Sequence, residues 1–407
     1  MNSIKSSATD SELGNSGVRV IIAELLINIA RACLLLTLGL FLFRQTQSLW
    51  AFASVFIFEA LTILVLQTIV GSTVDRFGPK IILLIASSCC FVLAIAITIS
   101  VSFGQLIMLV LPLVFLHNGI RSFFRVATFA LLPSLFSGST LLKVNAKLAV
   151  SLQLGQVSGA LLAGLFIEAF GFPTVFVSIA VCYLAAFFCY LGLPKALERK
   201  ENSLVKIGYW ARILQFLKNN PRFLIFTIIS SIDFSLVAVL NLLIPQTIEI
   251  GFGGQARWLT IIEITFALGA ILSGSFSSKL EIDEKNYWIV SMCGGLFTIL
   301  ALTVMMNPHD REHVMILFLF CAGFANTWSA ILWLTFLQKI SPPNIVGMLG
   351  SIRVLINTVT VAILLGGISF FSTISIVGGS FNVAIALLSG ALLLILALNI
   401  FVRHHAD

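Results

Sequence analysis

The chain has 407 residues, of which 59% are hydrophobic and only 10% are charged, with a formal net charge of +7. Soluble domains carry about 25% charged residues, so this composition excludes a soluble globular protein and indicates a multi-pass membrane protein. The sequence lacks the clusters of basic and aromatic residues that are typical of nucleic-acid binding, and we therefore expect no nucleic acid among its partners.

Twelve apolar stretches are long enough to cross a bilayer, since a helix needs about 20 apolar residues to span the hydrocarbon. The first six are residues 20–43, 49–70, 81–101, 106–132, 144–169 and 174–193, and the second six are 223–248, 258–278, 287–306, 314–337, 346–371 and 374–402. This pattern predicts an all-α membrane protein with twelve transmembrane helices in two six-helix bundles.

Three polar segments set the predicted domain boundaries. Residues 1–19 form an N-terminal tail, without the apolar core of a signal peptide, and residues 403–407 form the C-terminus. Residues 194–221 are the longest polar stretch and are rich in Lys and Arg. They separate a predicted N-terminal bundle, residues 20–193, from a predicted C-terminal bundle, residues 222–402.

Lys and Arg are unevenly distributed between the two sides of the membrane. Seventeen lie on the side that holds both termini and the central loop, counting Lys147 at the start of the span 144–169, against three on the other side and four deeper inside spans. Because basic residues are enriched in cytoplasmic loops, we predict that both termini and the central loop are cytoplasmic. Residues 208–219 of that loop are predicted to form a short amphipathic helix, since Trp210, Ile213, Leu214 and Leu217 fall on one face.

The first span carries two ionisable residues, Glu24 and Arg31, one heptad apart. An ionisable residue at bilayer depth is costly unless it is paired or faces water, so each is a candidate functional residue. With a rise of about 1.5 Å per residue, Arg31 lies close to the bilayer midplane and is a candidate substrate-binding residue. Glu24 and Glu59, in the second span, are candidate proton-coupling residues, because desolvation favours a neutral carboxyl group that can bind and release protons.

The turn between the second and third spans reads Gly71-Ser-Thr-Val-Asp75-Arg76-Phe-Gly78-Pro-Lys80. Its glycines allow helix ends to approach closely and to take positive φ, and its charged residues can hydrogen-bond the ends of neighbouring helices. The stretch resembles the signature between helices 2 and 3 of the major facilitator superfamily, except that Pro79 stands at one basic position. The resemblance implies alternating access, in which this turn holds cytoplasmic helix ends together in one state and releases them in the other.

The span 106–132 carries His117, Arg121 and Arg125 at positions i, i+4 and i+8, and hence on one helical face. Two arginines four residues apart repel each other unless an anion lies near, and the planar guanidinium group suits carboxylate or phosphate. We therefore assign Arg31, His117, Arg121 and Arg125 as candidate substrate-binding residues. Two alternatives stay open: Arg125 snorkels or pairs at the cytoplasmic end, and His117 is a packed polar residue and not a proton carrier.

The span 144–169 contains Gly155, Gly159 and Gly164. Small residues at such spacing permit close helix packing in lipid, and we assign these three to a helix-packing motif. The stretch also resembles the antiporter motif of the superfamily's drug exporters, Gly-x-x-x-Gly-Pro-x-x-Gly-Gly, with Ala160 and Ala163 in place of the proline and one glycine. This second resemblance favours export.

Asp233 lies about ten residues into the span 223–248, at a depth similar to that of Arg31. Since the superfamily lines its central cavity with helices 1, 4, 7 and 10, the resemblance implies that Asp233 and Arg31 face each other or a substrate. Asp233 is the third candidate proton-coupling residue, and the alternative is a fixed salt bridge to Arg31. A degraded copy of the turn, residues 274–279, follows the eighth span, as expected of a duplicated six-helix unit.

Two further stretches narrow the resemblance to one branch. Residues 123–134 with 141–146, and residues 337–347, resemble the branch that holds bacterial enterobactin exporters and macrolide-efflux proteins. The resemblance implies a monomer in the bacterial inner membrane, in two pseudo-symmetric bundles. The expected partners are a small-molecule substrate, protons and membrane lipid.

These features together predict a proton-coupled exporter of a small organic anion of siderophore type. The alternatives are an importer of a small organic anion or loaded siderophore, a multidrug or macrolide exporter, a lipid-moving facilitator, and a non-transporting membrane sensor on the same scaffold. The sequence shows no nucleophile–base pair, metal-ligand spacing or nucleotide-binding loop, and its seven cysteines all lie in predicted spans. We therefore expect no enzymatic activity, no metal and no cofactor.

Overall fold

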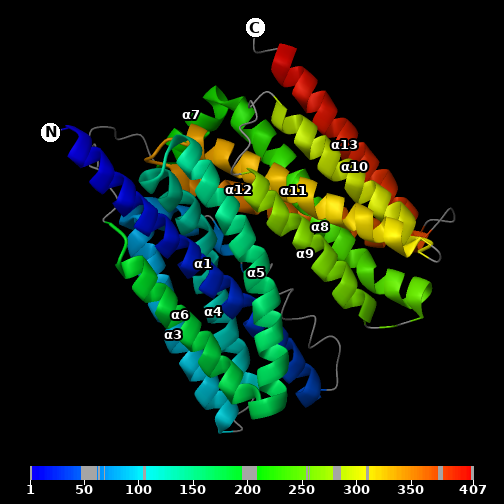
Figure 1. Ribbon diagram of the computed structural model, residues 1–407, viewed down its shortest axis with the longest axis horizontal. Helices are drawn as coiled ribbons and strands as arrows, with labels where there is room; N and C mark the ends of the chain where they lie inside the picture. Colours follow the sequence, from blue (N-terminus) through cyan, green and yellow to red (C-terminus); the bar gives the residue numbers. More distant parts are fainter. Residues whose placement is uncertain are drawn as a thin grey trace. The chain divides into compact units, whose positions relative to one another are not determined.

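The computed structural model describes residues 2–46, 62, 65–67, 69–103, 107–194, 209–253, 255, 257–277, 286–308, 311–374 and 379–404 (Figure 1). The elements in these ranges are α-helices. A helix pairs its backbone N–H and C=O groups within one segment, which is the requirement that lipid imposes on a spanning chain.

Twelve helices are assigned over these residues. They are α1 (Asn2–Thr46), α3 (Pro79–Ser102), α4 (Ile107–Leu135), α5 (Gly138–Phe170), α6 (Phe172–Leu191), α7 (Tyr209–Asn219), α8 (Pro221–Phe252), α9 (Arg257–Ser277), α10 (Tyr287–Met305), α11 (Glu312–Ile340), α12 (Val346–Ile374) and α13 (Ser380–His404). Nine of the helices in the described part of the chain are long and apolar enough to cross a membrane.

The predicted spans and the helices agree closely along the chain. Eleven of the twelve spans coincide with a long helix, and the short helix predicted over residues 208–219 is confirmed as α7. The span 49–70 lies largely outside the described residues, and so does Glu59. The N-terminal tail is helical rather than irregular, because α1 begins at Asn2 and continues into the first span.

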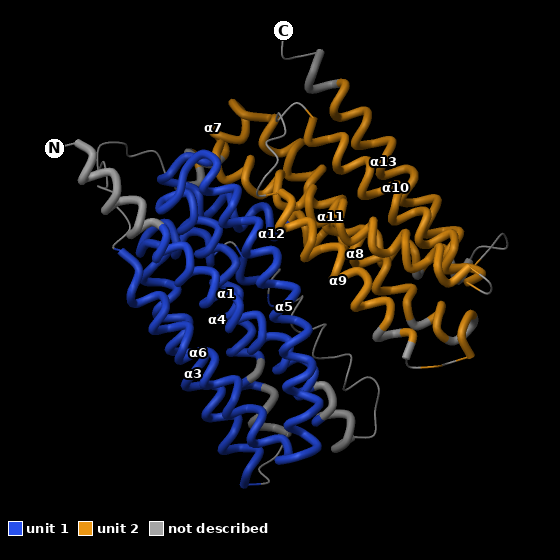
Figure 2. The backbone as a smooth tube through the Cα atoms, viewed as in Figure 1, with its two compact units in different colours: residues 1–206, 341–355 blue, residues 207–340, 356–407 orange. Residues whose placement is uncertain are grey.

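The chain forms two compact units (Figure 2). Unit 1 comprises Met1–Lys206 and Ser341–Leu355, and unit 2 comprises Ile207–Ile340 and Ile356–Asp407, so that α12 begins in unit 1 and ends in unit 2. In unit 1, α1 packs against α5 and α6, and α3 packs against α4 and α6. In unit 2, α11 packs against α8, α9 and α10, and α13 packs against α8 and α10.

Glycines permit the close crossing of α1 and α5 in unit 1. A Cβ atom at Gly155 would lie 2.5 Å from the Cβ of Asn28, and one at Gly159 would lie 2.5 Å from the carbonyl oxygen of Ile29. Gly164 departs from the predicted motif, since it is exposed and no atom lies within 4 Å of the position its Cβ would take. Five residues turn a helix about 140° past a full turn, so the buried Ala163 occupies the third packing position in its place.

A second glycine pair, which the sequence analysis did not single out, joins α9 to α11 in unit 2. A Cβ atom at Gly269 would overlap the carbonyl oxygen of Phe320, and one at Gly323 would overlap that of Phe266. Only glycine allows backbones this close. The two helices therefore cross at van der Waals contact between backbone atoms.

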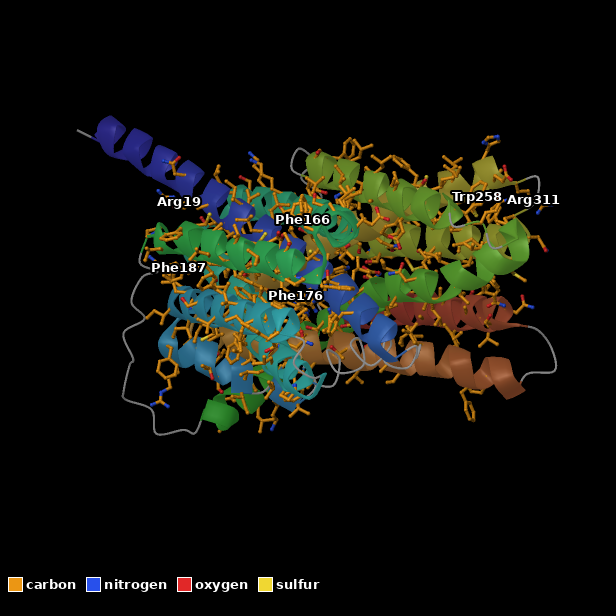
Figure 3. All side chains as sticks on the ribbon, turned by 90° about the horizontal axis from the view of Figure 1, so that it is seen from below. Arg19, Phe166, Phe176, Phe187, Trp258 and Arg311 are labelled. Atoms are coloured by element: carbon orange, nitrogen blue, oxygen red, sulfur yellow. The ribbon has the colours of Figure 1, made fainter. Side chains whose placement is uncertain are left out.

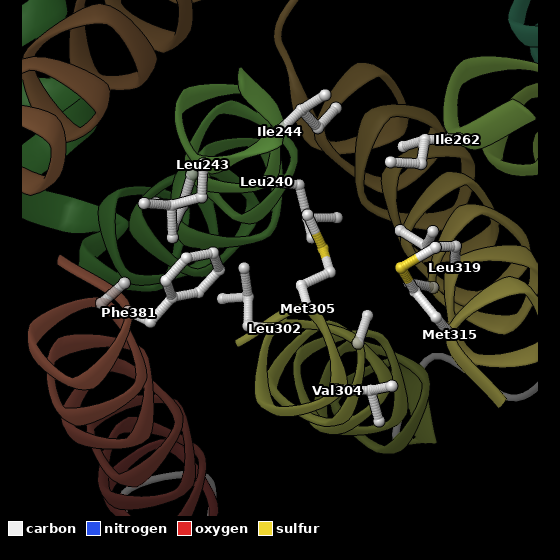
Figure 4. Packing of buried hydrophobic residues seen from close by; sticks show 14 of the residues in the cluster. Leu240, Leu243, Ile244, Ile262, Leu302, Val304, Met305, Met315, Leu319 and Phe381 are labelled. Carbon is white, nitrogen blue, oxygen red and sulfur yellow. The ribbon is translucent and has the colours of Figure 1, made fainter. Parts of the chain in front are cut away.

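The hydrophobic core of unit 2 gathers side chains from α8 to α13 (Figure 4). Leu240 of α8, Met305 of α10 and Leu319 of α11 belong to it, and Phe381 of α13 closes one side. The outward faces of the helices also carry large apolar side chains, such as Phe188 and Leu393, because lipid and not water covers them. Trp258 of the core and the exposed Arg311 lie near the same end of unit 2 (Figure 3).

Candidate functional site

The signature turn binds the first turn of α12. The backbone N–H groups of Gly347 and Met348 donate to Asp75 Oδ1 at 2.7 Å and to Asp75 Oδ2 at 2.9 Å. The first N–H groups of a helix have no intrahelical partner and carry the positive end of its dipole. The Asp75 carboxylate therefore caps α12 from a distant part of the sequence.

Lys80, at the other end of the turn, binds the opposite kind of helix end. Its Nζ donates to the carbonyl oxygen of Leu191 at 3.1 Å and to that of Leu193. Arg19 donates to the neighbouring carbonyl of Gly192. The last carbonyls of a helix carry the negative end of its dipole, so two cations close the C-terminus of α6. The predicted bonds from the turn to helix ends are thus present for Asp75 and Lys80.

Two glycines let the turn lie close to α12. A Cβ atom at Gly71 would lie 2.8 Å from Met348 Cα, and one at Gly347 would lie 2.7 Å from Asp75 Oδ1. Gly78 takes a φ of +84°, which favours glycine and places Pro79 at the start of α3. Arg76 is exposed, with its guanidinium group 5.3 Å from the ring centre of Phe77.

A basic and aromatic cluster lies between α1, α3, α4 and α6 in unit 1. His117 is fully buried, and its ring packs edge-on against Tyr183 with 5.3 Å between centroids. Phe124 stacks on Tyr183 with 6.1 Å between centroids. Arg31 and Arg121 both act electrostatically on Tyr183. Of the four predicted substrate-binding residues, His117 thus contacts Tyr183, and Arg31 and Arg121 act on it electrostatically.

Arg125, the fourth predicted residue, belongs to a different group. Its side chain is exposed, and it acts electrostatically on Glu24. Glu24 Oε1 accepts hydrogen bonds from Thr128 Oγ1 at 2.5 Å and from the hydroxyl of Tyr190 at 3.0 Å. Glu24 therefore joins α1, α4 and α6 through polar contacts in unit 1.

Asp233 is 99% buried in unit 2, where it meets α10 and α11. Its Oδ2 accepts a hydrogen bond from Ser291 Oγ at 2.8 Å and contacts Ser329 Oγ. The two serine oxygens lie 2.7 Å apart, and the indole N–H of Trp333 donates to Ser291 Oγ at 2.7 Å. Oδ1 of Asp233 is buried and has no hydrogen-bond partner among the described residues.

The sequence matches a family model described as Major Facilitator Superfamily over residues 20–365. The chain belongs to the Major Facilitator Superfamily. It is accordingly a multi-pass secondary transporter and not an enzyme. No curated protein matches the sequence.

Solved structures of the superfamily share the fold at low sequence identity. The proton:xylose symporter XylE, bound to 6-bromo-6-deoxy-D-glucose, has a TM-score of 0.70 at 14% identity, with 98% of this chain and 97% of that chain covered. A bacterial homologue of the iron transporter ferroportin, in an outward-facing state, has a TM-score of 0.71 at 14% identity (96% and 100% covered). The human organic anion transporter MFSD10 has a TM-score of 0.71 at 16% identity, with 95% of this chain and 99% of that chain covered. At these identities the likeness shows the fold alone.

The sequence analysis of this superfamily member missed the partners of its buried charges. Two of the chain's four tyrosines, Tyr183 and Tyr190, stand one heptad apart on α6 and are both buried. That spacing places them on one face and was a usable signal. Ser329 and Trp333 likewise share a face of α11 at i and i+4. Ser291 had no comparable signal, because hydroxyl groups are common in apolar helices, where they bond their own backbone.

Proposed function

We propose that the chain is a proton-coupled exporter of a small organic anion, with a carboxylate-bearing siderophore as the substrate class. The observation that carries this proposal is that Arg31 of α1 and Arg121 of α4 both act electrostatically on the buried Tyr183 of α6. Two guanidinium groups make their surroundings electropositive, which favours an anion there. A substrate with carboxylate groups supplies that anion and matches the planar fork of arginine.

Proton coupling is supported by the setting of Asp233. The carboxyl group is buried among helices of unit 2 and is held by two serine hydroxyl groups. In such a place the protonated, neutral form of a carboxyl group has a low free-energy cost, whereas the ionised form has a high one. The group can therefore bind and release a proton during a transport cycle. Glu24 is a second candidate in unit 1, and Glu59, outside the described residues, is a third.

The fold is compatible with this substrate class but does not select it. The human organic anion transporter MFSD10 has the same fold, as does the proton:xylose symporter XylE. The stretches at residues 123–134 and 337–347 resemble the enterobactin-exporter and macrolide-efflux branch. The choice of an anion rests on the arginines, and the choice of export rests on the antiporter-like stretch around Gly155.

The cycle that we propose is alternating access between two bundles, residues 20–193 and 222–402, joined by the cytoplasmic loop 194–221. The bonds from Asp75 to Gly347 and Met348 would hold the cytoplasmic end of α12 in one state. The transporter would act as a monomer in the bacterial inner membrane, with both termini in the cytoplasm.

The first experiment measures accumulation in cells that lack their own exporters, with and without the protein. A labelled carboxylate siderophore and a cationic dye are compared before and after the proton gradient is collapsed. We expect gradient-dependent loss of the siderophore from cells, and a decrease of about tenfold or more in Arg121→Ala, the effect of one lost charge-assisted contact. The matched control is Lys143→Ala, which removes an exposed positive charge from the same unit.

Each other outcome points to a different function. Loss of the dye alone would indicate multidrug efflux, and a gain of siderophore inside the cells would indicate import. A signalling response that persists in Asp233→Asn, without movement of either probe, would favour the membrane sensor. Equal effects of Arg121→Ala and Lys143→Ala would remove the support for an anion site.

A further inference from the structure

Around Asp233, three close oxygen–oxygen contacts each need a hydrogen atom, and with the carboxyl group ionised only two hydrogen atoms are present. Asp233 Oδ2, Ser291 Oγ and Ser329 Oγ form a triangle with all three sides at hydrogen-bond distance. Each side needs one hydrogen atom between its two oxygens. A serine hydroxyl supplies one hydrogen and accepts through two lone pairs, so the two serines fill only two sides.

The indole N–H of Trp333 does not provide the missing hydrogen. It donates to Ser291 Oγ at 2.7 Å from outside the triangle, so that it occupies a lone pair of Ser291 and leaves the three sides unchanged. With Asp233 ionised, two oxygens would therefore face each other at this distance without a hydrogen between them, which is repulsive.

A proton on Oδ2 removes this conflict. The carboxyl O–H then donates to one serine, that serine donates to the other, and the second serine donates back to Oδ2. The ring closes in either direction, and in both Ser291 keeps a lone pair for Trp333. Oδ1 has no hydrogen-bond partner among the described residues, so a proton placed there would have no acceptor.

We propose that Ser291, Ser329 and Trp333 complete the binding site of the coupling proton, which is bound on Asp233 Oδ2 as the third hydrogen of this ring. That the proton is the coupling ion rests on the proposed function. Release of the proton would leave one side of the triangle unfilled, and if both serines then turned to the carboxylate, the bond between Ser291 and Ser329, one of those that join α10 to α11, would be lost. Proton release would thereby loosen one helix contact in unit 2.

Trp333 acts as a positioning residue for this ring. It is buried, its ring stacks on Phe226 at 5.2 Å, and Tyr287 and Phe336 pack edge-on against it. These contacts fix the indole plane and so aim its N–H at Ser291. From α10 and α11, the side chains that face Asp233 are thus the two serines, with Trp333 and Tyr287 behind them. Within the described residues of unit 2, no charged side chain acts on Asp233 electrostatically.

The ring is better suited to a proton than to a metal cation. A sodium-like ion prefers several oxygen ligands whose lone pairs point inward. Here the side chains supply the carboxylate and two hydroxyl groups, and one hydroxyl already accepts the Trp333 N–H. Proton and sodium are nevertheless separable by experiment.

The test is an infrared pH titration of the purified protein in lipid, following the carboxyl C=O band that Asp233→Asn removes. The hypothesis predicts that Ser291→Ala or Ser329→Ala moves the midpoint of protonation to lower pH by about one unit, a tenfold loss of proton affinity. Removal of one serine hydroxyl takes two hydrogen bonds of the ring from the protonated form and one hydrogen bond from the ionised form. The protonated form is therefore destabilised more. Ser329→Thr keeps the hydroxyl group and should restore the wild-type midpoint. Trp333→Phe should shift the midpoint in the same direction by less.

Ser235→Ala is the matched control, because Ser235 is buried on α8 and donates only to the carbonyl of Ser231 in its own helix. A shift of the midpoint to higher pH in the serine variants would show that the hydroxyls are plain donors to a carboxylate, and would overturn the ring. An unchanged midpoint in the serine variants, or a shift equal to that of Ser235→Ala, would also overturn the ring.

Wild-type protein supplies a test that does not depend on folding of the variants. If sodium chloride, but not choline chloride, removes the carboxyl band at constant pH, the site binds a metal cation and the proton ring is wrong. The outcome is also separate from that of the transport assay. A titration that behaves as predicted, in a protein whose transport ignores the proton gradient, would support the ring as a proton site and reject the proposed coupling.

Discussion

Two tyrosines on one face of α6 have opposite surroundings. Tyr190 donates a hydrogen bond to Glu24 at 3.0 Å. The hydroxyl of Tyr183 is buried without a hydrogen-bond partner among the described residues, although Arg31 and Arg121 act on it. A buried hydroxyl without a partner lowers stability, so under the proposed function we expect the Tyr183 hydroxyl to bind substrate.

We predict that Tyr183→Phe leaves the thermal stability unchanged or higher and weakens substrate affinity by about tenfold, the effect of one hydrogen bond. Tyr190→Phe should have the reverse pattern, because it removes the hydroxyl that donates to Glu24. We expect a loss of about 1–3 kcal/mol of stability and little direct effect on substrate affinity. Thermal unfolding and concentration-dependent transport in proteoliposomes measure both quantities. If Tyr183→Phe lowers the melting temperature as much as Tyr190→Phe, the hydroxyl has a structural partner and no role in binding.

The residues that sequence reasoning found and missed differ in a simple physical way. Arg31, Arg121 and Asp233 were found because a charge in an apolar span is conspicuous at any rotation of the helix. Their partners Tyr183, Ser291 and Ser329 were missed, because these helices are apolar on every side and offer no periodicity that shows which face is inside. The separation of Arg125 from Arg121 was left open as an alternative, because a shared helical face does not fix how deeply each position is buried.

At the scale of helices, the contact between α1 and α5 depends on glycine at two positions. We predict that Gly159→Ala costs about 1–3 kcal/mol, as overpacking does, because its Cβ would press on the carbonyl oxygen of Ile29 and the Cβ of Ala32. Gly164→Ala is the matched control, since open space surrounds that position and alanine favours a helix by about 1 kcal/mol. The measurement is thermal unfolding followed by tryptophan fluorescence. Equal melting temperatures for the two variants would contradict a tight crossing at Gly159.

The cap on α12 gives a second prediction at this scale. Asp75→Asn keeps one acceptor oxygen and places an amide donor against the other N–H, so we expect it to release one of the two N–H groups of Gly347 and Met348 and to weaken the cap. Hydrogen–deuterium exchange should then accelerate in the peptide that covers the start of α12, together with a loss of about 1–3 kcal/mol of stability. Glu168→Gln, at an exposed position on α5, controls for the loss of a negative charge. Unchanged exchange at Met348 would mean that other groups hold the helix end.

Helix ends and signature turns of this kind are well predicted from sequence. Glycine, proline and charge at the ends of two apolar spans restrict the backbone strongly, and the bonds of Asp75 and Lys80 were expected from residue type alone. Which helix Asp75 binds could not be predicted, because residues 75 and 347 are far apart in the chain and their contact depends on the tertiary fold.

At the scale of the molecule, each unit holds one group of ionisable residues among its helices. Unit 1 has the buried His117 with the half-buried Arg31 and Arg121, and unit 2 has the buried Asp233 with its two serines. An ionisable group held away from water is costly, so the binding of a charged species changes the free energy of each group. In the exchange that we propose, the substrate anion would bind at the arginines and the proton at the carboxylate.

The orientation of the whole chain in the membrane is predicted by its basic residues. Seventeen Lys and Arg lie on the side of the termini and three on the other side, so the termini should be cytoplasmic. Arg311 and Lys143 are exposed positions on the predicted outer and inner sides. In a background without native cysteines, a membrane-impermeant maleimide applied to intact cells should label Arg311→Cys and spare Lys143→Cys. Everted vesicles should give the opposite result. Labelling of Lys143→Cys from outside would reverse the predicted topology.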